Sequence, residues 1–97
     1  MFLYNISVIL EENLDNSIVS YIENELLSAS NYPYHVLEML DSPHPGNTFC
    51  IQFQVPTEES IDDIKANHVA ELQAYIQQHF AEKIFLFDSV MKYLPKK

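Results

Sequence analysis

The sequence contains no arginine, and its five lysines face 14 acidic residues, which gives a formal net charge of −9. Nucleic-acid binding depends on basic side chains that displace counterions from phosphates, and an anionic membrane surface repels an acidic protein. We therefore expect neither a nucleic-acid partner nor a membrane partner. Arginine is also the usual bidentate partner of phosphate and carboxylate groups, so its absence excludes an acylphosphatase-like site. The acidity itself is typical of solvated helix surfaces.

The sequence has only one cysteine, Cys50. A disulfide within the chain is therefore impossible, and we expect a cytoplasmic location. The apolar segment 2–10 lacks the preceding basic region and the following small-residue site of a signal peptide, so we expect it to be part of the fold. No apolar run approaches the roughly 18 residues that a membrane-spanning helix requires.

Glycine and tryptophan are scarce as well, since Gly46 is the only glycine and tryptophan is absent. Gly46 lies in the segment Pro43–Asn47, whose composition predicts the clearest turn of the chain. Amino-acid-sensing domains built on the plan described below usually carry glycine in the turn after their first strand. The corresponding segment here, Glu11–Asn13, has none, so we exclude that function.

Four segments have the alternating pattern of β-strands and are rich in β-branched and aromatic residues. They are residues 2–10, 34–40, 48–55 and 84–93. In the first segment one side is fully apolar, whereas the other mixes Leu3 and Ile9 with Asn5 and Ser7. The last segment is apolar on both sides except at three positions. Both patterns indicate strands that are covered on more than one side.

Two amphipathic helices are predicted between these strands. The first has apolar residues every four positions from Leu14 and is predicted to run to about Ser30, before Pro33. Asn13 or Asp15 is predicted to cap its start. The second is predicted to be capped by Thr57 and to end near residues 80–82. Its predicted buried stripe consists of Ile61, Ile64, His68, Leu72, Ile76 and Phe80.

The order β-α-β-β-α-β predicts one ferredoxin-like domain over residues 1–97, an α+β fold with a four-stranded antiparallel sheet. Right-handed crossovers place both helices on one face of the sheet. Strands one and three are then central, and strands two and four are edges. The uncovered face is too apolar to remain in water comfortably, so we expect a homodimer in which two sheets pack face to face.

Three passages carry a family resemblance: Tyr4–Val8, Cys50–Phe53 and the stretch from Phe80 through Lys83-Ile84 to Phe87. Together they resemble a family of small bacterial proteins catalogued only as a domain of unknown function. Its members open with a similar Tyr-Asn-(Val/Ile)-(Thr/Ser) strand and carry a glutamine in the third strand. The resemblance spans the whole chain and implies a ferredoxin-like fold of the dimeric α/β-barrel kind. It does not imply any particular activity. Asn5 and Gln52 match its polar strand positions.

Four polar residues are candidates for a ligand site because they share one parity on the two central strands. They are Asn5, Ser7, Gln52 and Gln54. If these strands pair, the four side chains form a polar patch in the middle of the uncovered face. The patch would be either the base of a ligand site inside a barrel or a hydrogen-bonded network that fixes the register of a dimer. We favour the network.

His68 is unusual because it lies on the apolar stripe of the second helix. It is either a haem ligand or general base, or a core or rim histidine with a satisfied hydrogen bond, and we favour the second interpretation. His79 is about 16 Å farther along the helix, so the two cannot share a metal. No zinc spacing is present, and we expect no metal and no cofactor. Glu38 and Asp88 belong to opposite edge strands, so they cannot form a catalytic pair.

Two functions remain. The first, which we favour, is a non-enzymatic homodimeric interaction module, based on the apolar fourth strand and the half-apolar uncovered face. The second is a small-molecule site in the same barrel, similar to cofactor-independent or haem-linked monooxygenases. Asn5 and His68 loosely match the layout of that group, although some members rely on a tryptophan. Residue parity leaves open whether Asn5 and His68 face one cavity.

Overall fold

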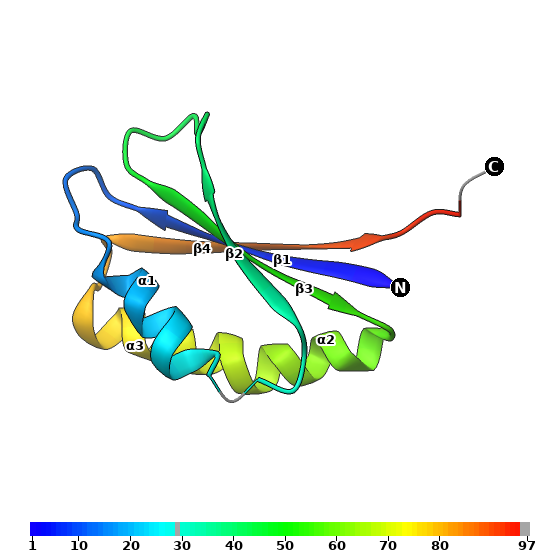
Figure 1. Ribbon diagram of the computed structural model, residues 1–97. Coiled ribbons are helices and arrows are strands. Elements are labelled where there is room, and N and C mark those ends of the chain that lie inside the picture. Colours follow the sequence, from blue (N-terminus) through cyan, green and yellow to red (C-terminus); the bar gives the residue numbers. More distant parts are fainter. Residues whose placement is uncertain (29, 96–97) are drawn as a thin grey trace.

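Strands and helical segments alternate in the order βαββαβ in the computed structural model, which describes residues 1–28 and 30–95 (Figure 1). The strands are β1 (Phe2–Leu10), β2 (Tyr34–Met39), β3 (Thr48–Val55) and β4 (Ile84–Lys92). The first helical segment joins α1 (Ser17–Tyr21) to a wider π-helical part, η1 (Ile22–Leu26). The second joins α2 (Glu58–Ile64), η2 (Lys65–Val69) and α3 (Ala70–His79). The predicted ferredoxin-like α+β fold is confirmed.

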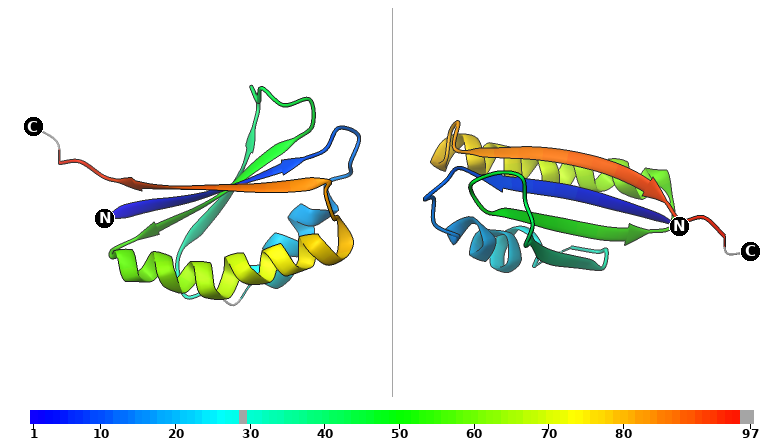
Figure 2. Two further views of the ribbon diagram at one scale, coloured as in Figure 1. Left: turned by 180° about the vertical axis from the view of Figure 1, so that it is seen from behind. Right: turned by 90° about the horizontal axis from the view of Figure 1, so that it is seen from above.

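The strands form one antiparallel sheet in the order β2-β3-β1-β4. Strands β1 and β3 are therefore central and β2 and β4 are the edges, as the sequence predicts. Tyr4 lies opposite Phe53 on β3 and opposite Val90 on β4, which sets the register of the three strands. Both helical segments cover the same face of the sheet, as the two views of Figure 2 show.

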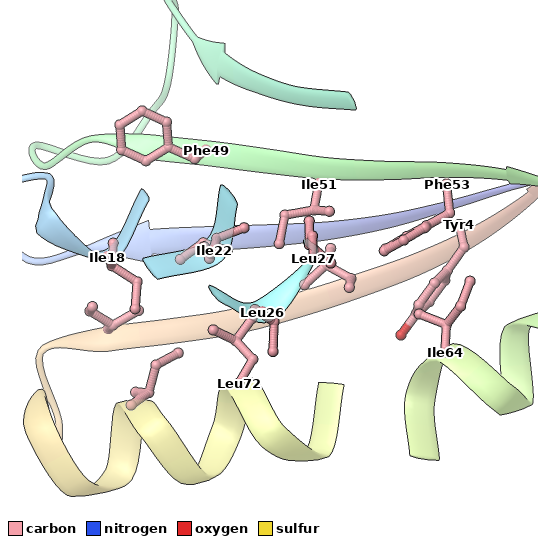
Figure 3. Close-up of a cluster of buried hydrophobic side chains, with 14 of the residues drawn as sticks. Tyr4, Ile18, Ile22, Leu26, Leu27, Phe49, Ile51, Phe53, Ile64 and Leu72 are labelled. Atoms are coloured by element: carbon pink, nitrogen blue, oxygen red, sulfur yellow. The ribbon is translucent and has the colours of Figure 1, made fainter. Parts of the chain in front are cut away.

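The core lies between the sheet and the helical layer. Alternate residues of β1 point toward the helices and are buried: Tyr4, Ile6, Val8 and Leu10. Figure 3 shows Ile18, Leu26 and Leu72 of the helical segments among the buried side chains between the helices and the sheet. Burial of each large apolar side chain contributes about 1.5–3 kcal/mol, so this single layer of contacts holds the helices on one face.

The first helical segment is shorter than predicted. It runs from Ser17 to Leu26 instead of continuing to Ser30. The N-cap is Asn16 and not the predicted Asn13 or Asp15. Asp15 Oδ1 accepts a hydrogen bond from the backbone N–H of Ser17 at 3.0 Å, and Asn13 lies in the preceding turn at a φ of 71°. The π-helical end brings the adjacent Leu26 and Leu27 into the core together, at 4% and 2% exposure. An ideal α-helix would direct two consecutive side chains about 100° apart.

The second helical segment begins as predicted. The hydroxyl of Thr57 accepts a hydrogen bond from the backbone N–H of Ser60 at 3.1 Å, which satisfies one of the unpaired donors of the first turn. Ile61, Ile64, Leu72 and Ile76 are buried against the sheet, whereas His68 and Phe80 are only partly buried. Among the described residues, no helix has the length and apolar character needed to span a membrane.

Candidate functional site

One face of the sheet carries no helix, and we call it the open face. The strand registers assign to it every residue that alternates with the core positions. It consists of Leu3, Asn5, Ser7 and Ile9 of β1, Thr48, Cys50, Gln52 and Gln54 of β3, His35, Leu37 and Met39 of β2, and Phe85, Phe87, Ser89 and Met91 of β4. Within the four described strands, no aspartate, glutamate or lysine points to this face. The open face of a strongly acidic protein is thus uncharged apart from any charge on His35.

A chain of polar side chains crosses the middle of the open face. Gln52 Nε2 donates a hydrogen bond to Asn5 Oδ1 at 3.2 Å, and Asn5 Nδ2 donates to Ser7 Oγ at 3.1 Å. Ser7 Oγ also lies 3.8 Å from the sulfur of Cys50. Asn5 is directly opposite Gln52, and Ser7 is opposite Cys50, so the registry of β1 and β3 creates these contacts.

The structure brings together three of the four polar residues predicted to form this patch. Gln54 is opposite Leu3, is exposed and makes no side-chain hydrogen bond with the other three in the described part of the chain. Cys50 takes its place in the network and is almost fully buried. Its parity already places it on this side of β3, but its role depends on the register, which the sequence pattern does not specify.

Large apolar side chains surround the polar chain. Phe87 is 71% exposed and Phe85 is 59% exposed on β4. Leu37 and Met39 on β2 and Met91 on β4 are also exposed. Contiguous apolar surface of this kind marks an interaction site more often than a solvated surface.

His68 lies on the opposite side of the sheet from Asn5. Its ring stacks on Phe53, with centroids 6.2 Å apart and planes at 8°, and Phe53 belongs to the core face. Asn5 and His68 therefore do not face one cavity. Nδ1 of His68 is buried and has no hydrogen-bond partner among the described residues, so no protein group supplies the predicted hydrogen bond at that atom. The ring is held by aromatic packing, which the spacing of polar residues could not reveal.

A second polar contact, which sequence reasoning missed, lies on the core face. The phenol of Tyr4 donates a hydrogen bond to Asp88 Oδ2 at 2.7 Å. Burial raises the pKa of Tyr4, and the hydrogen bond to Asp88 and its negative charge raise it further. Lys65 Nζ lies 5.7 Å from the centre of the Tyr4 ring, within reach of a cation–π interaction. Asp88 thus serves as a hydrogen-bond acceptor for a core tyrosine as well as an edge-strand charge.

Two adjoining hollows are formed where the β2–β3 connection meets the open face and the end of β1. One has a volume of about 370 Å³ and is bordered by Ser7, Thr48 and Phe87. The other, of about 800 Å³, is bordered by Glu11, Glu12 and Glu82. Ile9 and His44 line both hollows. Within residues 1–28 and 30–95 no group of three or more histidine, cysteine or acidic side chains is placed to hold a metal ion.

Comparison with known proteins identifies the family of this chain and a solved structure with a similar fold. Residues 1–94 match the family described as "Domain of unknown function (DUF4286)". A search of curated proteins finds no match. The chain is similar in structure to an ethyl tert-butyl ether d (EthD) family protein from Bacillus halodurans C-125, with a TM-score of 0.59 and 10% sequence identity. The alignment covers 92% of this chain and 97% of that protein.

Proposed function

We propose that this chain, which belongs to the DUF4286 family, acts as a non-enzymatic interaction module whose working form is a homodimer. In the proposed dimer the open faces of two copies pack against each other and enclose the polar chain of Asn5, Ser7 and Gln52. The observation that carries the proposal is the absence of acidic and lysine side chains from that face within the described strands.

Charge distribution supports pairing with a second copy. The chain carries 14 acidic residues and a formal net charge of −9, so most surfaces of two copies repel each other. Like charges brought together at an interface destabilise the complex. The open face avoids this repulsion, because its strand residues are apolar or neutral and polar. Glu38 and Asp88 alternate onto the core face instead.

The size of the open face is sufficient for a stable interface. The four strands of six to nine residues at about 3.3 Å per residue, spaced about 4.8 Å apart, give a projected area of roughly 500 Å². Side-chain relief and the loop at residues 43–47 add to this area. The roughly 800 Å² per partner of a standard interface is therefore within reach. Packing of two sheets face to face places them about 10 Å apart.

The polar chain supports a specific role within such an interface. Gln52, Asn5 and Ser7 already satisfy part of one another's hydrogen-bonding capacity, so their burial costs less than the burial of isolated amides. Any remaining amide groups need partners on the second copy, and only certain registers supply them. We infer that the network selects the register of the dimer, while Phe87, Leu37 and Met91 provide most of the buried apolar surface.

The monooxygenase-like alternative has less support. It requires Asn5 and His68 to act on one ligand, and these residues lie on opposite sides of the sheet. His68 instead packs flat against Phe53. A small-molecule site, if this chain has one, therefore needs a different set of residues.

Sedimentation equilibrium at micromolar concentration tests the proposed dimer. We expect a mass of twice the 11.3 kDa of the chain. Phe87→Glu and Leu37→Glu each place a carboxylate on the open face, and we expect each to weaken the dimer at least about tenfold, since a buried like-charge pair costs several kcal/mol. Both side chains are exposed, so the fold should be retained.

The matched control is Gln78→Glu, which introduces the same glutamate side chain at an exposed position of α3, away from the open face. It also lowers the formal net charge by one, so it controls for general repulsion. We expect Gln78→Glu to leave the dimer unchanged. A wild-type chain that sediments as a monomer at micromolar concentration would refute the proposal, as would equal weakening by all three variants.

A further inference from the structure

Strand β4 is an edge strand whose outer side has no partner. In the described part of the chain it pairs only with β1. Just after the strand, Tyr93 donates a backbone hydrogen bond to Met1 at 3.1 Å, and just before it, Lys83 accepts one at 2.8 Å from the first residue after β1. The odd-numbered residues of β4 therefore direct their N–H and C=O groups toward β1, because these directions alternate along an antiparallel strand. The same groups of the even-numbered residues point away from the sheet.

The helices leave the second half of this edge uncovered. On the core face of β4, Ile84 is buried and Leu86 is partly buried, but the later core-face residues are exposed. Val90 is 48% exposed, and Leu94, just after the strand, is 80% exposed. In Figure 1 the chain after β4 projects beyond the helices. An edge strand that is long and exposed is a template for pairing with another chain.

The even-numbered residues of this edge form a self-complementary pattern that is apolar, acidic, apolar, basic and apolar. They are Leu86, Asp88, Val90, Lys92 and Leu94. When two copies pair antiparallel about a twofold axis at Val90, Asp88 lies opposite Lys92 of the second copy. Leu86 then lies opposite Leu94 of the second copy, and the axis repeats each contact. Opposite charges that face each other across antiparallel strands stabilise the pairing.

Other registers of the same edge lack this match. An axis at Asp88 places two aspartates opposite each other, and an axis at Lys92 does the same with two lysines, which is destabilising. An axis at residue 89 or 91 leaves each charge opposite an apolar side chain. Asp88 can form the ion pair without releasing Tyr4, because the phenol binds Oδ2 and a carboxylate has a second acceptor oxygen. The two charges therefore select one register.

We propose that the outer edge of β4 is a second self-association surface, at which two copies pair edge to edge with Val90 on the twofold axis. The two sheets then continue into one. This contact uses the backbone edge and the core-face side chains of β4, whereas the proposed dimer uses the open face, so one chain can make both contacts. The edge contact involves few residues and is small, which makes it the weaker of the two. It joins dimers at higher protein concentration.

Disulfide cross-linking under mild oxidation tests this register. In the paired edges a cysteine at position 90 has its Cα about 5.5 Å from its counterpart, within the range of a disulfide. A cysteine at position 94 is about 26 Å from its counterpart. We expect Val90→Cys to form covalent dimers at least about tenfold faster than Leu94→Cys. Random collisions would instead favour the more exposed position 94. The wild type, whose only thiol is the buried Cys50, controls for that thiol.

A charge variant tests the ion pairs. When Lys92→Glu is added to Val90→Cys, each Asp88 faces a carboxylate across the axis. We expect cross-linking to slow at least about tenfold, because two attractive pairs become repulsive. The matched control is Lys83→Glu, which makes the same change in net charge at an exposed position outside the paired segment. It should leave the rate unchanged.

Three results would overturn the inference: equal rates for Val90→Cys and Leu94→Cys, an unchanged rate with Lys92→Glu, or equal slowing by Lys92→Glu and Lys83→Glu. Adding Leu37→Glu to Val90→Cys separates the two contacts, because Leu37 lies on the opposite edge strand. We expect the cross-linking rate to persist. A fall to the rate of Leu94→Cys would mean that the cross-link forms through the open face, which would refute the edge contact and leave the proposed dimer standing. A persistent cross-link in a chain whose sedimentation is unaffected by Leu37→Glu would refute the proposed dimer alone.

Discussion

Tyr4 and Asp88 are 84 positions apart in the sequence, yet the Tyr4 phenol donates a 2.7 Å hydrogen bond to Asp88 Oδ2. The bond crosses from central strand β1 to edge strand β4 on the core face. Tyr4 is fully buried, and burial is the largest cause of its raised pKa, followed by the hydrogen bond to Asp88 and its charge. The folded chain therefore holds this phenol neutral as a donor. The contact ties the fourth strand to the centre of the sheet.

The raised pKa of Tyr4 predicts a loss of stability in alkali. In the unfolded chain a tyrosine ionises near pH ~10, and in the folded chain Tyr4 ionises only above that. Its contribution is therefore complete below about pH 10 and falls as the pH rises beyond it. Tyr4→Phe should lose about 1 kcal/mol of unfolding free energy at neutral pH and show a shallower decline above about pH 10.

Urea unfolding at about pH 7 and about pH 11 measures this difference. Tyr21 and Tyr32 also have raised pKa values, so the quantity to compare is the decline in the variant against that in the wild type. Tyr32→Phe is the comparison variant: its phenol is bonded to Asp63 at an exposed site, where solvent screens the interaction. Its alkaline decline should therefore differ from that of the wild type less than the decline of Tyr4→Phe does. An identical alkaline decline in wild type and Tyr4→Phe would contradict the assignment.

His68 predicts a stabilising substitution. Its Nδ1 is buried without a hydrogen-bond partner in the described part of the chain, and an unsatisfied buried polar atom costs about 1–3 kcal/mol. Phenylalanine keeps the flat contact with Phe53 and removes that atom. We expect His68→Phe to raise the unfolding free energy by about 1 kcal/mol in urea titrations, whereas His79→Phe, at an exposed position, should change it by less than about 0.5 kcal/mol. A destabilised His68→Phe would indicate that Nδ1 has a partner such as water.

Gly46 predicts a local defect. A Cβ atom there would lie 1.9 Å from the Leu10 carbonyl oxygen and 2.8 Å from the carbonyl carbon of Glu11, so Gly46→Ala must push the connection away from β1. We expect a loss of about 1–3 kcal/mol, the usual cost of overpacking. Amide exchange at Leu10, whose N–H bonds to Asn47, should accelerate. Pro45→Ala is the neighbouring control and should cost less than about 1 kcal/mol; equal effects of the two would contradict the steric explanation.

The strands and their order could be predicted from the sequence because alternation on β1 and β3 is regular and is interrupted by clear turns. The uncovered half-apolar face follows from the same alternation. The end of the first helix could not be predicted, because the adjacent Leu26 and Leu27 both fit a helical stripe until the core requires them on one side. Sequence spacing gives helical periodicity, whereas packing decides where that periodicity breaks.

The candidate site was predictable only in part. Parity places Asn5, Ser7, Gln52, Gln54 and Cys50 on one face, but the register decides that Cys50 rather than Gln54 joins the network. The sequence could not show that His68 and Asn5 lie on opposite sides of the sheet. A histidine on a helix stripe does not indicate which residues of the strands point toward that helix. The larger hollow beside the open face was missed for a similar reason, since Glu11, Glu12 and Glu82, which border it, come from two distant turns.

The central claim is that the open face pairs with the open face of a second copy. An isotope-filtered NOE experiment tests this claim most directly. In a mixture of ¹³C-labelled and unlabelled chains, only contacts between copies give cross-peaks. The account predicts cross-peaks that connect Leu3, Leu37, Phe87 and Met91 between copies, and none from Leu72 or Ile76, which are buried on α3 against the core face. Cross-peaks confined to helix residues, or none at all at concentrations where the wild type is expected to be dimeric, would contradict it.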